Sequence, residues 1–248
     1  MLNFAIVHYN TPELTTCLCG SIYKLHPGSH ITVFDNSDKR PLDTYKILRV
    51  SYIDNTHGQI INFDQELKKY PLRQIKEQTE SGCNFGSAKH SMSVDWLCKH
   101  LVDNFILLDS DVLVKRPVDF IDDNFICCSD TTQIHEDIYR ILPMISYINV
   151  KKMREHNISF FDGSRMHGLV DVSSRYNWYD TGASFYEDIV KLNLFHRIDC
   201  NDYIVHYGNG SWRQPNKRPI FYGNRTDVYT TEPFMNWLDK YNNLWDIK

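Results

Sequence analysis

The stretch "NFILLDSDVLV", residues Asn104 to Val114, joins an apolar run to two aspartates separated by one serine and then becomes apolar again. A short apolar run of residues that favour β-structure predicts a buried strand, which here ends at Asp109. Two carboxylates one residue apart repel each other unless a cation lies beside them, and hard oxygen ligands favour Mg²⁺ or Mn²⁺. Asp109 and Asp111 are therefore candidate metal ligands. The alternative is that they only form a turn, where aspartate is common.

Strands and helices alternate before this stretch. Strand-like runs occupy residues 3–9, 30–38 and 48–54, and apolar residues at helical spacing occupy residues 12–25 and 86–103. This alternation predicts an α/β fold with a mostly parallel sheet and flanking helices. Ligands of such sheets bind at the carboxyl ends of the strands. Asp35, Asp109 and Asp111 each follow a predicted strand, so we expect all three at one edge of the sheet.

The composition limits the class of protein. A chain of 248 residues, 42% hydrophobic and 23% charged, can bury one substantial core, and its net charge of −4 gives no field that recruits nucleic acid. The sequence shows neither a signal-peptide pattern nor an apolar stretch of membrane-span length, so we expect a cytoplasmic protein. The seven cysteines are odd in number and form no pair of CxxC motifs, which favours reduced thiols.

The second half of the chain is less regular. We predict a strand within residues 123–130 and, within residues 142–157, a further strand that turns into a short helix near Lys151. Asp180 precedes a stretch of helical periodicity, where it fits the N-cap position. The stretch "YIVHYGNGSW", residues Tyr203 to Trp212, predicts a strand that ends at His206 and a glycine-containing loop. A basic loop and a terminal helix are expected beyond it.

The order of four motifs resembles a known family. "NFAIVHYNTPELTTCLCGSI", "ITVFDNSD", "NFGSAKHSMSVDWL" and "FILLDSDVLV" together look like the nucleotide-sugar-binding half of a GT-A glycosyltransferase, most similar to family 2-like enzymes, over roughly residues 3–117. The resemblance implies one GT-A domain over residues 1–248. Its nucleotide-sugar half would be 1–117, its acceptor half with a metal histidine 118–212, and its C-terminal loop and helix 213–248.

The resemblance also implies roles for individual residues. The first strand and its loop would hold the base and ribose, and Asp35 would contact the same part of the donor. The Asn-x-Gly loop would lie beside the nucleotide with the helical turn after it, and the Asp-Ser-Asp segment would approach the ribose and the metal-bound diphosphate. The residues concerned are His8, Tyr9, Asn10, Asp35, Asn84, Gly86, Lys89, His90 as a weaker candidate, Asp109, Ser110 and Asp111.

His206 resembles the C-terminal histidine that completes the metal site in such enzymes. Its imidazole suits Mn²⁺ better than Mg²⁺. The loop after it would close on the diphosphate, with Gly208 letting backbone N–H groups approach phosphate and Ser211 as a further contact. The segment departs from the family by lacking a lysine-proline-tryptophan ending, which leaves the diphosphate contacts of Ser211 open.

These features predict a metal-dependent glycosyltransferase that moves a sugar from a nucleoside-diphosphate sugar, UDP-linked by preference, to a hydroxyl of a glycan or glycolipid. Inversion would need a carboxylate base from the acceptor half, for which Asp180 is the first candidate and Glu187 the second. Three alternatives stay open, namely a sugar-phosphate nucleotidyltransferase, a haloacid-dehalogenase-type phosphatase and a non-enzymatic carbohydrate-binding protein. Peripheral association with a membrane and the oligomeric state are not determined by the sequence.

Overall fold

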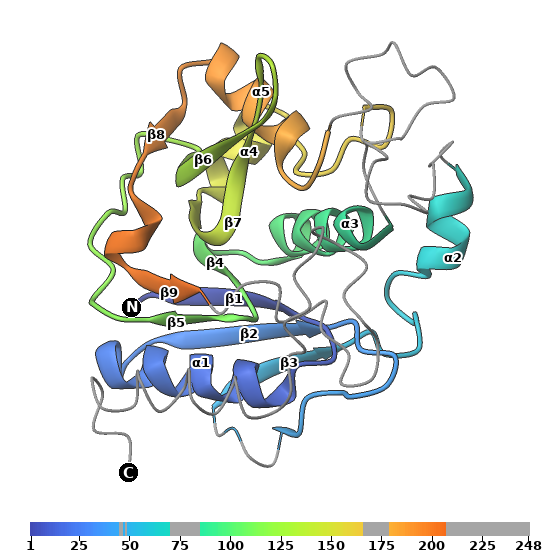
Figure 1. Cartoon of the computed structure of the whole chain (residues 1–248), viewed down its shortest axis with the longest axis vertical. Coiled ribbons are helices and arrows are strands. Elements are labelled where there is room, and N and C mark those ends of the chain that lie inside the picture. The colour runs from blue at the N-terminus through green and yellow to red at the C-terminus, as the bar shows by residue number, and fades with distance from the viewer. Residues whose placement is uncertain (45–46, 48, 70–84, 166–178, 207–248) are drawn as a thin grey trace, which may run out of the picture.

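The computed structural model describes residues 1–44, 47, 49–69, 85–165 and 179–206 (Figure 1). Their centre is a seven-stranded sheet in the order β3-β2-β1-β4-β7-β6-β8, and β5 pairs with β9 in a separate two-stranded sheet. The strands are β1 (Asn3–His8), β2 (His30–Asp35), β3 (Val50–Asp54), β4 (Phe105–Asp109), β5 (Val112–Val114), β6 (Cys127–His135), β7 (Ile138–Ile148), β8 (Phe195–Arg197) and β9 (Ile204–His206). The helices are α1 (Pro12–Leu25), α2 (Phe63–Glu66), α3 (Phe85–His100), α4 (Val150–Glu155) and α5 (Ala183–Lys191), with 3₁₀ turns η2 (Leu67–Lys69) and η4 (Cys200–Asp202).

The large sheet is mostly parallel. β1 pairs in parallel with β2 and β4, and β2 with β3, whereas β7 runs antiparallel to both β4 and β6. β6 and β8 are again parallel, so β7 is the one reversed strand of this sheet. The predicted α/β class, with a mostly parallel sheet and flanking helices, is therefore confirmed.

The helices cover the two faces of the sheet because side chains of a strand alternate between faces. Phe4 and Ile6 of β1 pack with Leu18 and Ile22 of α1 on one face. Ala5 and Val7 point to the other face, which α3, α4 and α5 cover (Figure 1). In α3 the predicted apolar stripe is buried where expected, through Val94, Leu97 and Cys98. Two hydrophobic clusters thus hold the sheet, one on each face.

Helix α1 begins and ends as its sequence predicts. Pro12 stands at the first helical position, where its missing N–H costs no hydrogen bond, and Thr11 precedes it at the N-cap. The backbone N–H of His26 donates to the carbonyl oxygen of Ile22 and closes the last turn. The hydroxyl of Thr11 makes no capping bond. It lies instead 3.1 Å from the hydroxyl of Ser110 and ties the start of α1 to the Asp-Ser-Asp turn.

The Asp-Ser-Asp turn is the point where the chain leaves the large sheet. β4 ends at Asp109, and β5 begins at Val112 and pairs antiparallel with β9, with Val112 opposite His206. The backbone N–H of Val114 donates to the hydroxyl of Ser21 on α1, which fixes the new direction. The two aspartates therefore stand where the chain passes from the large sheet to the two-stranded sheet.

Several predicted boundaries differ from the structure. α5 begins at Ala183, with Gly182 as its N-cap, so Asp180 lies two residues before the cap. Gly182 has a φ of 77°, and a Cβ there would meet Ile141 Cγ1 at 2.5 Å, so a glycine is required at this close approach. Gly86, expected in a loop, lies in the first turn of α3. Strand β6 extends to His135, beyond the predicted Asp130, because it forms a long hairpin with β7.

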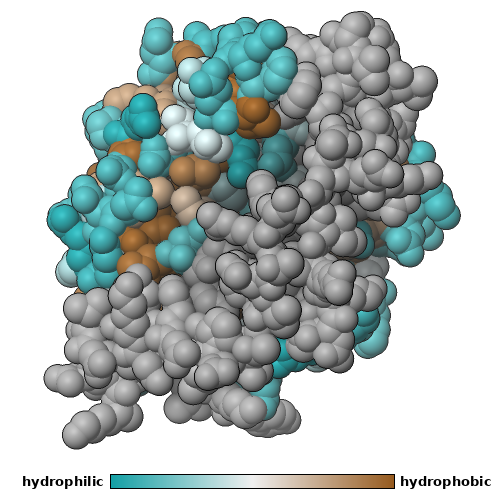
Figure 2. Space-filling view, in the orientation of Figure 1, coloured by the Kyte–Doolittle hydropathy of each residue, from teal (hydrophilic) through white to brown (hydrophobic). Residues whose placement is uncertain are grey.

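The cysteines, the helices and the surface add three findings. The six cysteines within the described ranges, all except Cys83, form no disulfide, as predicted for reduced thiols. No helix in the described part of the chain combines the length and apolar character that crossing a membrane requires. On the side seen in Figure 2 the described surface is mostly hydrophilic, with hydrophobic residues between hydrophilic ones.

Candidate active site at the carboxyl edge of the sheet

The carboxyl ends of the central strands bring the predicted residues together. His8 is the register partner of Asp35 across β1 and β2, and Val7 is the partner of Asp109 across β1 and β4. Asp109 ends β4, and Ser110 and Asp111 follow it directly. The predicted collection of carboxylates at one edge of the sheet is confirmed for Asp35 and Asp109 by this register.

Asp111 meets the histidine that the sequence selected. The pairing of β5 with β9 places Nε2 of His206 at 3.3 Å from Oδ1 of Asp111. The side chain of Asp111 is 5% exposed and that of His206 is 34% exposed, so the histidine forms the solvent side of the pair. A buried carboxylate beside an imidazole is an arrangement that can hold a cation.

Asp109 has a different partner. Nε2 of His90, on α3, lies 3.2 Å from Oδ1 of Asp109, and the two side chains are 19% and 24% exposed. The atoms are close, but the ring N–H does not have the geometry of a hydrogen bond. The sequence indicated His90 as a weaker candidate beside the nucleotide but gave no indication of its contact with Asp109. The available signal was its place one helical turn into the element that precedes β4.

The predicted three-ligand metal site is not assembled in this arrangement. Within residues 1–44, 47, 49–69, 85–165 and 179–206, the group whose ligand atoms all lie within 4.8 Å of one another is Asp130, Asp199 and Cys200. Asp109, Asp111 and His206 do not reach that spacing, because each aspartate faces its own histidine. A single ion bound by all of them requires the carboxylates to turn toward each other.

The group of Asp130, Asp199 and Cys200 has protein partners already. Nε of Arg197 lies 3.3 Å from Oδ1 of Asp130. Oδ1 of Asp199 accepts the backbone N–H of Asn201 and caps the 3₁₀ turn η4. Burial, followed by the charge of Asp130, raises the pKa of the Cys200 thiol to about 12, so it is protonated at neutral pH. Because metals bind the thiolate, we attribute a structural role to this group.

Two predicted nucleotide contacts are enclosed by the protein. His8 has no exposed surface, and its Nδ1 lies 2.7 Å from the hydroxyl of Thr15. Asp35 is also fully buried, and its carboxylate accepts the backbone N–H groups of Ser37 and Leu42 and the hydroxyl of Tyr52. These bonds leave both side chains without a surface for a ligand. In this structure they organise the loop after β2, in contrast to the donor contacts that the resemblance implied.

The loops beyond His8 and Asp35 carry the accessible polar groups. Asn10 is 7% exposed, and its side-chain oxygen accepts the N–H groups of Lys39 and Arg40. Its amide donates to Oδ1 of Asp38 at 2.6 Å. Asp38 is exposed, whereas Tyr9 is half-buried. Burial alone would raise the pKa of Asp38, but the bond from Asn10 and the nearby Lys39 outweigh it and lower that pKa.

The remaining predicted donor contacts divide into four cases. Ser110 is 3% exposed and holds the turn through Thr11. The ammonium group of Lys89 lies 5.6 Å from the ring centre of Phe63 on α2, a cation–π distance. Gly86 lies in α3, as described above. The predicted contacts at Asn84, Gly208 and Ser211 fall outside the described residues.

The two candidate bases lie in different surroundings. Asp180 has Oδ2 at 3.2 Å from Nη1 of Arg140, and the adjacent Thr181 donates its hydroxyl to the carbonyl oxygen of Ser87 in the first turn of α3. His90 lies on the same helix one turn further along. The segment before α5 is thus joined to the helix whose histidine faces Asp109.

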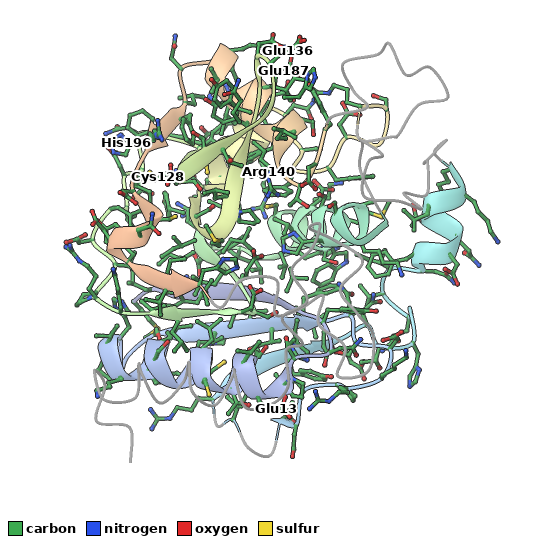
Figure 3. All side chains as sticks on the ribbon, viewed as in Figure 1. Glu13, Cys128, Glu136, Arg140, Glu187 and His196 are labelled. Carbon is green, nitrogen blue, oxygen red and sulfur yellow. The ribbon has the colours of Figure 1, made fainter. Side chains whose placement is uncertain are left out.

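Glu187 is held by an ion-pair network. Its carboxylate accepts the hydroxyl of Tyr179 and lies 3.0 Å from Nζ of Lys191 and 3.6 Å from Arg165. Arg165 also forms a bidentate ion pair with Asp188. Figure 3 shows Glu187 beside Glu136 at the end of the molecule opposite Glu13, whereas Arg140 lies nearer the centre. Glu187 is therefore engaged by Tyr179, Lys191 and Arg165, whereas Asp180 lies beside Arg140.

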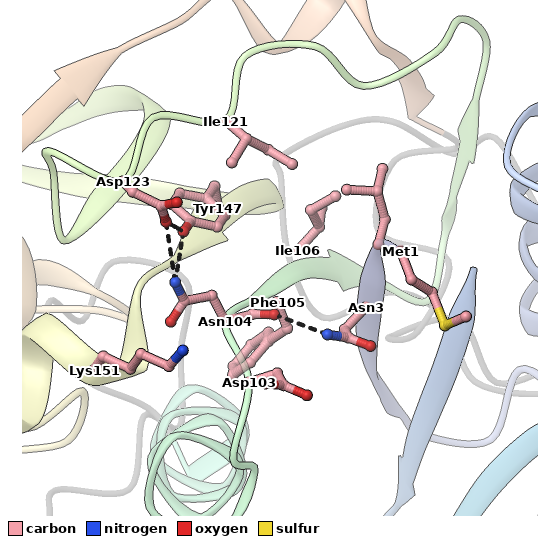
Figure 4. A pocket seen from close by; sticks show the side chains of 11 residues that line it. Met1, Asn3, Asp103, Asn104, Phe105, Ile106, Ile121, Asp123, Tyr147 and Lys151 are labelled. Atoms are coloured by element: carbon pink, nitrogen blue, oxygen red, sulfur yellow. Dashed lines mark hydrogen bonds between the residues drawn. The ribbon is translucent and has the colours of Figure 1, made fainter. Parts of the chain in front are cut away.

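A hollow of about 360 Å³ lies at the other edge of the sheet (Figure 4). It is lined at the start of β1 and β4 by residues that include Asn3, Asn104 and Tyr147. The amide of Asn104 donates to the Tyr147 hydroxyl and to Asp123, and Tyr147 also donates to Asp123. We locate the candidate site at the carboxyl edge, because the strand-end carboxylates and their histidines gather there and not around this hollow.

No protein-family model matches the chain, and no curated protein matches it. Solved glycosyltransferase structures do. The galactosyltransferase LgtC in complex with donor and acceptor sugar analogues is 14% identical with a TM-score of 0.43, over 80% of this chain and 73% of LgtC. The glycosyltransferase GlyE of Streptococcus pneumoniae TIGR4 is 10% identical with a TM-score of 0.46, over 96% of this chain and 63% of GlyE. The bifunctional glycosyltransferase WbbM is 12% identical with a TM-score of 0.45, over 79% of this chain and 38% of WbbM.

These structures are glycosyltransferases. Their likeness to this chain is distant. The strand order and register of the large sheet establish the α/β fold.

Proposed function

We propose that the chain is a metal-dependent glycosyltransferase that moves a sugar from a nucleoside-diphosphate sugar, UDP-linked by preference, to a hydroxyl group of a glycan or glycolipid. The observation that supports it most is the pairing of Asp111 with His206 beside Asp109, at the carboxyl edge of a parallel sheet. Carboxylate and imidazole together suit Mn²⁺. A fold of this kind binds its ligands at the same edge.

The chemistry of the donor set fits a divalent cation. Asp109, Asp111 and His206 would hold it, with Ser110 and Thr11 fixing the turn between the two aspartates. When bound, such an ion stabilises the negative charge that develops on a diphosphate leaving group. The protein's own contribution is to keep two carboxylates on a rigid turn that hydrogen bonds and strand pairing hold on both sides.

We assign the donor base and ribose to the exposed part of the neighbouring loops, namely Tyr9 and Asp38. Asp38 replaces the enclosed Asp35 in this assignment, because its carboxylate is exposed whereas that of Asp35 has three protein donors. Asp38 already accepts a hydrogen bond from Asn10, which holds it at the sheet edge. Gly208 and Ser211 keep their proposed role at the diphosphate.

For an inverting reaction we assign the base to Asp180. Its segment contacts the first turn of α3 through Thr181, and α3 also carries His90 beside Asp109. Glu187 is the weaker choice because Tyr179, Lys191 and Arg165 all engage its carboxylate. The base would remove the proton from the acceptor hydroxyl as that oxygen attacks the anomeric carbon.

The test is binding and turnover with defined ligands. We expect UDP-sugars to raise the melting temperature of the purified chain in the presence of Mn²⁺ and to do so less in EDTA, since a ligand that binds only the folded state stabilises it. Release of UDP on addition of acceptor sugars would follow. No stabilisation by any nucleotide sugar, with phosphate released from sugar phosphates or pyrophosphate from a nucleoside triphosphate, would contradict the proposal and favour a phosphatase or a nucleotidyltransferase.

A further inference from the structure

We propose that His90 is a direct ligand of the same cation, so that the metal site consists of two aspartate–histidine pairs, Asp109 with His90 and Asp111 with His206. This inference rests on the proposed metal-dependent function and adds a fourth protein ligand to it. It starts from the observation that each aspartate of the turn lies beside an imidazole. His90 belongs to α3, which precedes the turn in the chain, and His206 belongs to β9, which follows it.

The spacing within each pair fits ligands that share an ion. Adjacent ligand atoms on an octahedral ion with bonds of about 2.1 Å lie roughly 3.0 Å apart. Nε2 of His90 lies 3.2 Å from Asp109, and Nε2 of His206 lies 3.3 Å from Asp111. The distance between imidazole nitrogen and carboxylate oxygen is therefore nearly the same in both pairs. It is slightly longer than the distance between neighbouring ligand atoms on one ion.

The surroundings of the His90 ring favour a ligand over a structural hydrogen bond. Both ring nitrogens are buried atoms without a hydrogen-bond partner among the described residues. Buried polar atoms of a folded protein normally have a partner, so an unsatisfied imidazole requires an explanation. Nε2 lies near Asp109 without the geometry of a hydrogen bond to it. An imidazole whose nitrogen lies beside a carboxylate but is not bonded to it is suited to share a cation with it.

Bringing the two pairs to one ion requires side chains to move. Opposite ligands of such an ion lie about 4.2 Å apart, whereas no three of His90, Asp109, Asp111 and His206 have ligand atoms that all lie within 4.8 Å of one another. The backbone between the aspartates is fixed through Ser110 and Thr11. Rotation of the aspartate side chains between staggered conformations is therefore the movement that closes the site.

The donor set has a consequence for metal choice. Two imidazoles and two carboxylates are softer than an all-oxygen site, so Mn²⁺ should bind better than Mg²⁺. Loss of one imidazole should weaken Mn²⁺ binding more than Mg²⁺ binding. This differential effect distinguishes a ligand from a residue that only supports the fold, because a structural loss would lower both affinities alike.

The experiment measures Mn²⁺ binding to the full chain by the electron paramagnetic resonance signal of free Mn²⁺, in the presence of UDP. We expect His90→Ala to raise the Kd for Mn²⁺ by at least about 10-fold, the scale on which even supporting residues of a metal site act. His156→Ala is the matched control, because it removes an exposed imidazole at the end of α4. An unchanged Kd in His90→Ala, or equal losses for Mn²⁺ and Mg²⁺, would overturn the inference.

A second measurement does not depend on the folding of any variant. Pulsed electron paramagnetic resonance of the Mn²⁺-bound wild type detects directly coordinated imidazole nitrogens, and we expect two of them. One coordinated nitrogen would assign the metal to His206 alone and overturn the role of His90, while leaving the proposed function intact. If the wild type binds no Mn²⁺ with UDP, the metal-dependent function fails together with the inference.

Discussion

Two loops at the same edge of the sheet both carry aspartates at strand ends, yet they differ in what surrounds the carboxylates. Asp35, after β2, is fully buried and accepts two backbone N–H groups and a tyrosine hydroxyl. Asp109 and Asp111, around the end of β4, face imidazoles instead. Strand-end position alone therefore does not separate the buried carboxylate of Asp35 from the proposed metal ligands. The kind of partner separates them, because three of the roughly four acceptor sites of the Asp35 carboxylate are taken by protein donors and its side chain is fully buried.

The largest effect is expected on the metal side of this comparison. Asp111→Asn should reduce sugar transfer by at least about 10³-fold and remove Mn²⁺-dependent nucleotide binding, because a neutral amide cannot balance the ion's charge. UDP release and Mn²⁺-dependent thermal shifts measure the two effects. Asp119→Asn is the control, because Asp119 is an exposed aspartate whose partners are Arg116 and Tyr203. Normal turnover in Asp111→Asn would remove the basis of the proposed function.

Substitution of the buried Asp35 should lower the stability of the fold. Asp35→Asn places an amide N–H₂ against N–H and O–H donors and should lower the free energy of unfolding by about 3 kcal/mol. Asp54→Asn is the matched control at the register partner in β3, because Asp54 is exposed and bonds only Thr56 and the nearby loop. Urea unfolding measures both. A stable Asp35→Asn variant with a raised KM for the donor would instead indicate that Asp35 contacts the nucleotide.

The next prediction tests whether Asp180 or Glu187 is the catalytic base of the acceptor half. Asp180→Asn should lower kcat by at least about 10²-fold with donor binding intact, the scale for loss of a general base. Glu187→Gln should keep kcat near the wild-type value and lower the melting temperature, because it breaks the contacts with Tyr179 and Lys191. The reverse pattern would move the base to Glu187. A product that retains the donor's anomeric configuration would exclude the inverting mechanism altogether.

The smallest effect concerns His8, the enclosed neighbour of Asp35. Burial lowers the pKa of His8 below its usual 6.5, only partly opposed by the charge of Asp35. Above that value the ring is neutral in both the folded and the unfolded chain. Below it the unfolded chain binds the proton more readily than the folded chain. The free energy of unfolding therefore decreases as the pH is lowered, until the lowered pKa of the folded state is reached.

His8→Asn should therefore lose less stability than the wild type between about pH 7.5 and about pH 5.5. Urea titrations at a series of pH values measure the difference in slope. Parallel curves for the two proteins would show that His8 does not titrate as a buried neutral ring. The asparagine amide keeps a partner for the Thr15 hydroxyl, which limits the loss of stability at neutral pH.

Much of the fold was predictable from the sequence because its signals are local. The apolar period of α3, the Pro12 start of α1 and the strand run before Asp109 were each confirmed. The start of α5 was not, because the requirement for Gly182 comes from its contact with Ile141 on β7. A residue's conformational constraint can be set by a neighbour that the local pattern does not contain.

The sequence by itself determined that Asp35, Asp109 and Asp111 follow strands of one parallel sheet, since hydrophobic period and chain order are enough to place strand ends at a common edge. It also indicated His206, at the end of a predicted strand that precedes a glycine-containing stretch of sequence. Only the tertiary structure decided that Asp35 is enclosed, because its donors Leu42 and Tyr52 come from a loop and a strand folded over it. The same holds for His90 and Asp109, whose contact depends on how α3 packs beside β4 and not on any spacing along the chain.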